Sequence, residues 1–322
     1  MRAMRGRRPP RTLRWLLARY LEERILRPAT AEMYAKTVET WIRDTGKPFL
    51  KDVTRRRALQ WRRQVLSRAS PETWNKHRRQ MRALLAFAIR QGYRRGRNPF
   101  DEVGPAPAPQ RLPRTVDLDD LAAIVDHLES GRSRLRPAWL WAMIVRALYL
   151  TGVRRRQLVG LRWGDVSIDR GTWLMRAETS KTRREYLVPL AREVIEDLVE
   201  LRRRTALKRG RPPFATEQVY NVCLFYPRYK GPELTEPQLT QTFARLSKET
   251  GIRISPHRLR HTAATQIVQI ADLESARYLL GHSSLQTTMR YVHPSMSYLK
   301  TLVDEMPVTW TRRRPRPGHD SR

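Results

Sequence analysis

The chain has 322 residues, of which 40% are hydrophobic, and a formal net charge of +33 from 64 basic and 31 acidic side chains. The hydrophobic content excludes a disordered basic tail protein, and the length suffices for two domains with cores of their own. The charge predicts a polyanionic partner, namely DNA, RNA or an anionic membrane surface. Only nine of the basic residues are lysines; arginine grips phosphate well, although a GC-rich genome would also favour its codons.

Cysteine content and hydropathy constrain the setting. A single cysteine, Cys223, excludes an intramolecular disulfide and a zinc site built on cysteines. The N-terminus is charged without an uninterrupted apolar region, so we expect no signal peptide. The most apolar stretch, residues 139–150, contains Arg146 and is too short to span a bilayer. We therefore expect a cytoplasmic protein with no membrane partner.

The first hundred residues predict a helical domain over 11–104, behind a basic, flexible N-terminus at 1–10. Apolar side chains recur at helical spacing after Thr12, up to Gly46, and again after Thr54. A fourth helix starts with Ser70 as N-cap and Pro71 at its first position. A polar face on a helix is usually only solvated, but the charge of the chain leads us to predict DNA contacts on this one. That face carries Asn75, Arg78, Arg79 and Arg82.

A proline-rich stretch follows. DEVGPAPAPQRLPR, residues 101–114, holds four prolines and a glycine, which predicts an interdomain linker at 105–114. The second domain is predicted at 115–306, with a basic tail at 307–322. An alternating pattern over 166–190 predicts a small antiparallel sheet with Lys181 at a turn. Helical patterns occupy most of the rest, near 117–129, 138–150, 154–161, 191–208, 236–249, 256–269, 272–280 and 284–291. The predicted fold class is therefore mainly α.

Several polar residues of the second domain have a chemical interpretation beside an ordinary one. Arg154 follows a predicted helix end at Gly152, so it lies at a helix start, where backbone N–H groups attract anions. Taken alone, it is one solvated arginine among many. His282 alone is a surface histidine after a helix, and Tyr291 alone is a packing residue whose phenol, with a pKa of about 10, is a poor nucleophile at neutral pH.

His257 and Arg260 lie three residues apart on a predicted helix and so share a face. His261 completes an H-x-x-x-H pair with His257. A zinc hydrolase would need glutamate after the first histidine, where Arg258 stands, so we exclude zinc hydrolysis.

Together these residues suit metal-free cleavage of a phosphodiester. Such a reaction needs positioned cations around the phosphate, and Arg154 and Arg260 can supply them. Tyr291 can attack and Lys181 can protonate the leaving oxygen. His257 and His282 can move protons or hydrogen-bond the phosphate. The sequence shows no acidic cluster for a metal, and we expect no cofactor.

The order and spacing of these groups resemble the tyrosine recombinase (phage integrase) family. TGVRRRQLVGLRWGDV resembles the box of the first catalytic arginine, at Arg154, and SKTRREYLVPL that of the lysine, at Lys181. HRLRHTAAT resembles the His-x-x-Arg box, and LLGHSSLQTTMRYVH the box with histidine and nucleophile. The segment from Ser70 to Phe100 resembles the last helix of the family's core-binding domain. One departure is Gln157, where the family usually has an acidic residue.

The resemblance implies a helical, SAM-like core-binding domain and a mostly helical catalytic domain that clamp double-stranded DNA. It implies cleavage and rejoining through a 3′-phosphotyrosyl link at Tyr291, for integration, excision or resolution of DNA. It further implies a homotetramer on two DNA sites, with an accessory directionality protein as a further candidate partner. Residues 296–306 would form a helix that docks on a neighbouring protomer. The compact organisation is similar to the Xer group.

Three other functions stay open at the level of sequence. A type IB topoisomerase uses similar groups to relax supercoils. A non-catalytic DNA-binding regulator could use the same fold. A general basic nucleic-acid binder would show steep salt dependence and no site preference.

Overall fold

The computed structural model describes residues 11–109, 113–179, 184–281, 283–289, 291–292, 300 and 303–306. The chain divides into two compact units, Met1–Arg111 and Leu112–Arg322, and each is considered by itself. The division falls inside the proline-rich stretch. Of the expected docking helix at 296–306 only residues 300 and 303–306 are described, and the N-terminal ten residues and the basic tail lie outside the described residues.

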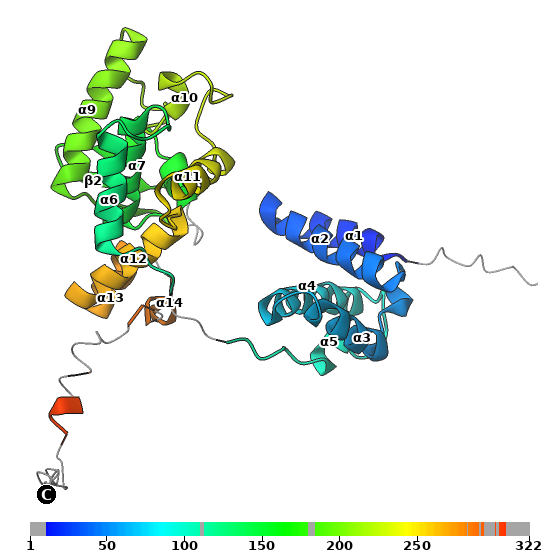
Figure 1. The fold of residues 1–322 in the computed structure, drawn as a ribbon. Helices are drawn as coiled ribbons and strands as arrows, with labels where there is room; N and C mark the ends of the chain where they lie inside the picture. Colours follow the sequence, from blue (N-terminus) through cyan, green and yellow to red (C-terminus); the bar gives the residue numbers. More distant parts are fainter. Residues whose placement is uncertain are drawn as a thin grey trace, which may run out of the picture. The chain divides into compact units, whose positions relative to one another are not determined.

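The N-terminal unit consists of helices, three of which begin directly after the predicted residues Thr12, Thr54 and Ser70 (Figure 1). The hydroxyl of Thr12 accepts a hydrogen bond from the Trp15 N–H at 3.1 Å, and that of Thr54 from Arg57 at 3.3 Å. These bonds satisfy N–H groups that have no partner inside the helix. The elements are α1 (Leu13–Glu23), α2 (Pro28–Thr45), η1 (Leu50–Asp52), α3 (Arg55–Leu66), α4 (Pro71–Arg90) and α5 (Pro99–Glu102).

Aromatic side chains fill the core of this unit. Trp61 lies edge-on to Trp41 and to Trp74, with ring centroids 5.1 and 5.6 Å apart. All three rings are fully buried, and Phe100 of α5 joins them. The sequence prediction missed α5, and Ala106, expected in the linker, is buried in this core. The reason is Asn75, whose amide makes two 2.8 Å hydrogen bonds to the backbone of Ala106.

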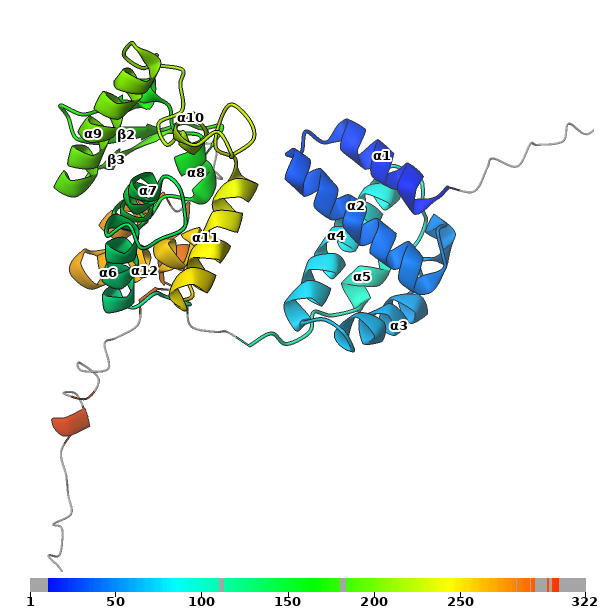
Figure 2. The ribbon, with the colours of Figure 1, turned by 45° about the horizontal axis from the view of Figure 1, so that its top comes forward.

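The C-terminal unit is mostly helical and contains one small sheet (Figure 2). The sheet has the antiparallel order β1-β2-β3 and lies where the alternating pattern predicted it. Trp173 pairs with Val166 on one side and with Val188 on the other. Trp173 and Val188 are buried, so one face of the sheet belongs to the core. The strands are β1 (Val166–Ser167), β2 (Thr172–Met175) and β3 (Tyr186–Pro189).

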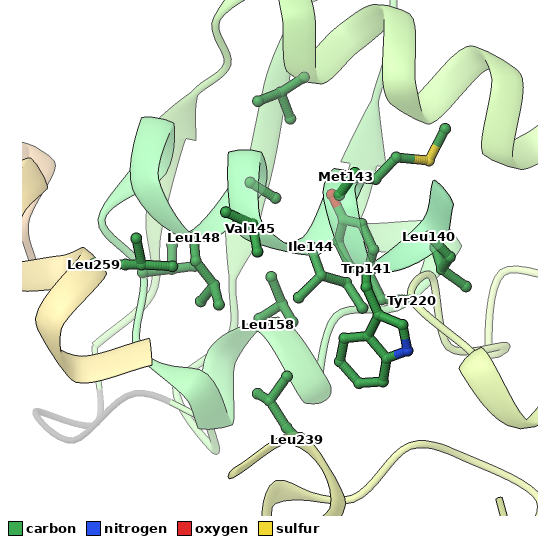
Figure 3. Close-up of a cluster of buried hydrophobic side chains, with 14 of the residues drawn as sticks. Leu140, Trp141, Met143, Ile144, Val145, Leu148, Leu158, Tyr220, Leu239 and Leu259 are labelled. Carbon is green, nitrogen blue, oxygen red and sulfur yellow. The ribbon is translucent and has the colours of Figure 1, made fainter. Parts of the chain in front are cut away.

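Helix α7 lies at the centre of this unit, because α6, α9 and α12 all pack against it. Apolar side chains of α7, among them Trp141 and Ile144, form one cluster with side chains from three other helices (Figure 3). The latter are Leu158, Leu239 and Leu259. The short helix α10 was not predicted. Among the described residues, no helix combines the length and the hydropathy that crossing a bilayer requires. The helices are α6 (Leu118–Glu129), α7 (Ala138–Thr151), α8 (Arg155–Val159), η2 (Trp163–Asp165), α9 (Arg192–Arg209), α10 (Val222–Phe225), α11 (Glu236–Thr250), α12 (Pro256–Ile270), α13 (Leu273–Leu279) and α14 (Leu285–Met289).

Candidate active site

Arg154 is the N-cap residue of α8. Gly152 ends α7 at φ +59°, a left-handed conformation that suits glycine, and turns the chain toward α8. The Arg154 backbone N–H donates to Oε1 of Gln157 at 2.9 Å. Its Nη1 atom is buried and has no hydrogen-bond partner within the described part of the chain. Burial lowers the pKa of Arg154. A buried guanidinium nitrogen of this kind is prepared to bind an anion.

Arg260 of α12 is almost completely buried. Its Nη1 donates to the Gly152 carbonyl at 2.5 Å and its Nη2 to the Leu280 carbonyl at 2.7 Å. Burial lowers the pKa of Arg260, and the positive charge of Arg154 lowers it further. The two predicted arginines, more than 100 residues apart in sequence, are therefore brought close enough to repel each other. A bound phosphate would relieve that repulsion.

Two histidines, His257 and His261, lie on α12, the helix that also carries Arg260. The Nε2 atoms of His257 and His261 are 2.9 Å apart, so one ring donates a hydrogen bond to the other. Burial and then the charges of Arg260, Arg155 and Arg154 lower the pKa of His257. A low pKa favours the neutral ring, which can accept a proton or a hydrogen bond near neutral pH.

Tyr291 follows α14 and is 7% exposed. Its backbone N–H donates to the Thr288 carbonyl at 2.9 Å, and its ring centroid lies 5.4 Å from that of His261. The Tyr291 phenol raises the pKa of both Arg154 and Arg260, against the larger effect of burial. Lys181 and His282 lie outside the described residues.

The sequence prediction gave no role to two residues that the structure places here. His261 entered only as part of an excluded zinc motif, although its position four residues after His257 indicated a shared helix face. Tyr186 of β3 accepts a hydrogen bond from Nε2 of Gln157 at 2.8 Å. Nothing in the sequence pattern links Tyr186 to Gln157, because the contact joins a strand and a helix start 29 residues apart.

The four residues of α4 predicted to contact DNA make several bonds inside their own unit. Asn75 binds the Ala106 backbone as described, Nε of Arg78 donates to the Val103 carbonyl, and Arg82 pairs with Asp101. Arg79 is exposed. Asn75, Arg78 and Arg79 also border a hollow of about 310 Å³, together with the acidic Glu72. The face therefore combines internal contacts with exposed positive charge.

A second basic hollow, of about 810 Å³, lies on the C-terminal unit. No acidic side chain lines it, and no ion pair within the described ranges engages the five cations around it. Two tyrosines line it as well, and Arg245 lies over the ring of Tyr229 at 5.7 Å. Such a surface suits a polyanion. The cations are Arg134, Arg136, Arg228, Lys230 and Arg245.

Within the same described ranges, no group of three His, Cys, Asp or Glu side chains is arranged to hold a metal ion.

Comparison with known proteins is consistent with this geometry. The model of the phage integrase family matches residues 114–297, more than half of the chain. A XerC-type tyrosine recombinase of Pseudomonas syringae is 30% identical over 92% of this chain, which spans 64% of the length of that relative. The tyrosine recombinase XerC of Salmonella typhi is 27% identical over 89% of this chain and 92% of its own length.

Solved structures share the fold at lower identity. The Tn1549 transposon integrase in complex with transposon right end DNA has a TM-score of 0.68 at 17% identity, covering 92% of this chain and 99% of that one. A lambda integrase tetramer bound to a Holliday junction has a TM-score of 0.67 at 19% identity, covering 88% and 77%.

Proposed function

The chain belongs to the phage integrase family, and we propose that it is a site-specific DNA recombinase of the tyrosine type. The observation that carries this proposal is that Arg260 binds the Gly152 carbonyl, two residues before Arg154, while the largely buried Tyr291 ring lies 5.4 Å from that of His261 on the helix of Arg260. A buried Arg260 and a half-buried Arg154 near a tyrosine are what an attack on a phosphodiester requires, since the phosphate gains charge in the transition state.

In the proposed reaction the Tyr291 oxygen attacks the phosphorus and loses its proton. The bond from phosphorus to the 5′ oxygen breaks, leaving a 3′-phosphotyrosyl link and a 5′-hydroxyl. Arg154 and Arg260 neutralise the non-bridging oxygens, while Lys181 supplies the proton to the leaving oxygen. His257, held by His261, and His282 hydrogen-bond the phosphate or move protons. The 5′-hydroxyl of a partner strand reverses the step, so the reaction consumes no nucleotide.

We further propose that the protein binds double-stranded DNA with both units and acts as a homotetramer on two sites. The net charge of +33, the basic hollow at α11 and the arginines around the hollow at α4 support the DNA contact. The tetramer of lambda integrase on a Holliday junction, which shares this fold, supports the assembly. An accessory directionality protein and a cytoplasmic location remain parts of the proposal.

The test is capture of covalent adducts. The protein is mixed with fragmented genomic DNA of its source, denatured, and the attached DNA is sequenced, with Tyr291→Phe as the matched variant. We expect adducts at one or a few sequences that disappear in the variant. Scattered adducts that depend on Tyr291 would indicate a topoisomerase instead. Tight binding without adducts in either protein, on supercoiled as well as linear DNA, would overturn the catalytic proposal in favour of a DNA-binding role.

A further inference from the structure

A hydrogen bond between Gln157 and Tyr186 connects two segments of the candidate active site. The Gln157 side chain is 1% exposed. Its Oε1 accepts from the Arg154 backbone N–H at 2.9 Å, and its Nε2 donates to the Tyr186 hydroxyl at 2.8 Å. The amide thus joins the first turn of α8 to strand β3. A carboxylate could accept both bonds, with the hydroxyl then donating, but an apolar side chain could make neither.

The far end of Tyr186 is pressed against Gly281. A Cβ atom at Gly281 would lie 2.5 Å from both Cζ and the hydroxyl oxygen of Tyr186, closer than side-chain atoms approach one another. Gly281 adopts φ +58° and stands directly after Leu280, whose carbonyl holds Arg260. The tyrosine therefore contacts the turn that positions Arg260.

These contacts link three segments of the chain that carry predicted catalytic residues. Gln157 is three residues after Arg154, Tyr186 is five residues after Lys181, and Gly281 is one residue before His282. Burial lowers the pKa of Arg154 and of Arg260, and the Tyr186 hydroxyl counteracts this at both.

We propose that Gln157 and Tyr186 form a positioning pair that sets the geometry of the phosphate site by holding the Arg154 turn and the Gly281 turn at a fixed spacing. Neither residue acts on the phosphate itself. The inference rests on the proposed function for its consequence in catalysis, but the contacts themselves belong to the free protein. Because strand cleavage needs the guanidinium groups placed to within a fraction of an ångström, loosening the pair lowers the cleavage rate more than it lowers DNA affinity.

The first measurement uses the free full-length protein and hydrogen–deuterium exchange. Tyr186→Phe removes only the hydroxyl and leaves Nε2 of Gln157 without that acceptor. We expect faster exchange in peptides that cover 154–159 and 281–291, and unchanged exchange in α9. The matched control is Tyr220→Phe, which makes the same chemical change at a fully buried tyrosine packed on Trp173. Unchanged exchange at both active-site segments would overturn the pairing.

The second measurement is the rate of adduct formation on the DNA site recovered by capture. We expect Tyr186→Phe and Gln157→Met each to slow it about tenfold, the effect of one lost hydrogen bond. Gln157→Glu should stay within about threefold of wild type, because its carboxylate can accept both bonds. DNA half-saturation should change less than about twofold in all of them.

A double variant separates the pair from two independent effects. With Gln157→Met in place, Tyr186→Phe should slow the reaction no further, because the bond is already lost. The inference would be overturned if the rate reductions caused by the two substitutions multiplied in the double variant. It would also be overturned if Tyr186→Phe formed adducts at the wild-type rate. A wild-type protein that forms no adduct would refute the proposed function, while the exchange measurement would still decide whether the pair exists.

Discussion

Gly281→Ala should destabilise the C-terminal unit more than Gly210→Ala does, and the difference measures the contact with Tyr186. Both glycines have left-handed backbones, with φ +58° and +69°. An L residue in that region costs about 1 kcal/mol. A Cβ at Gly210 would meet nothing within 4 Å, whereas one at Gly281 would meet Tyr186 atoms at 2.5 Å. Overpacking of this kind adds about 1–3 kcal/mol. We therefore expect about 1 kcal/mol at Gly210 and about 2–4 kcal/mol at Gly281.

The assay is amide hydrogen exchange of α12, which packs on the central helix α7 of the same unit. Protection should fall by about a factor of ten for each 1.4 kcal/mol lost. Equal losses at the two glycines would refute the reasoning. A second comparison tests the cause: in a Tyr186→Leu background the ring is gone, so Gly281→Ala should then cost no more than Gly210→Ala. A cost that persists without the ring would mean that the clash lies elsewhere.

Three further predictions follow from other parts of the structure. Burial and the neighbouring arginines lower the pKa of His257 below its ordinary 6.5, so the unfolded chain binds its proton more readily than the folded one. Stability should therefore be lost as the pH falls through about 6.5 toward the lower folded pKa. Between pH 8 and 5, the urea midpoint of unfolding should fall less for His257→Gln than for wild type. Equal falls in the two proteins would contradict this prediction. In the basic hollow, Arg228→Ser and Arg245→Ser should each reduce the slope of log affinity against log salt for DNA by about 1. Arg203→Ser should reduce this slope less, because the Arg203 guanidinium already pairs with Glu200. Equal slopes in the three variants would contradict the prediction that DNA binds at the hollow. Arg146→Met should cost about 3 kcal/mol, because it leaves the mostly buried Asp197 without its two 2.8 Å bonds. Adding Asp197→Leu should recover most of that loss in urea unfolding, and no recovery would show that the pair is not the cause.

Gln157 shows how a departure from a family pattern can be read physically. In sequence, the amide raises the question of what holds Arg154, since the family usually has a carboxylate there. In the structure the amide caps the first turn of α8 through one atom and binds Tyr186 through the other. A neutral side chain thereby holds the arginine without lowering the positive charge of the site.

Local chemistry was enough to predict most helices, whereas the catalytic assignment came from an order and spacing of residues that resemble the phage integrase family, and it stays a prediction. The helix starts at Thr12, Thr54 and Ser255 depend on a capping hydroxyl, and the start after Ser70 on the proline at the first helical position, so a short window of sequence contains the signal. The small sheet was predicted for the same reason, from alternation between two turns. The identity and order of Arg154, His257, Arg260 and Tyr291 likewise required only the chain itself.

Tertiary structure alone decided which groups meet. Arg260 binds carbonyls of Gly152 and Leu280, which no periodicity connects to it, and Tyr186 meets Gln157 and Gly281 for reasons of packing geometry. Asn75 also binds the backbone of Ala106, so part of the expected linker belongs to the core of the N-terminal unit. Capping and alternation act over a few residues and leave a pattern in the sequence, whereas these contacts depend on how helices and strands far apart in the chain are oriented by a shared core.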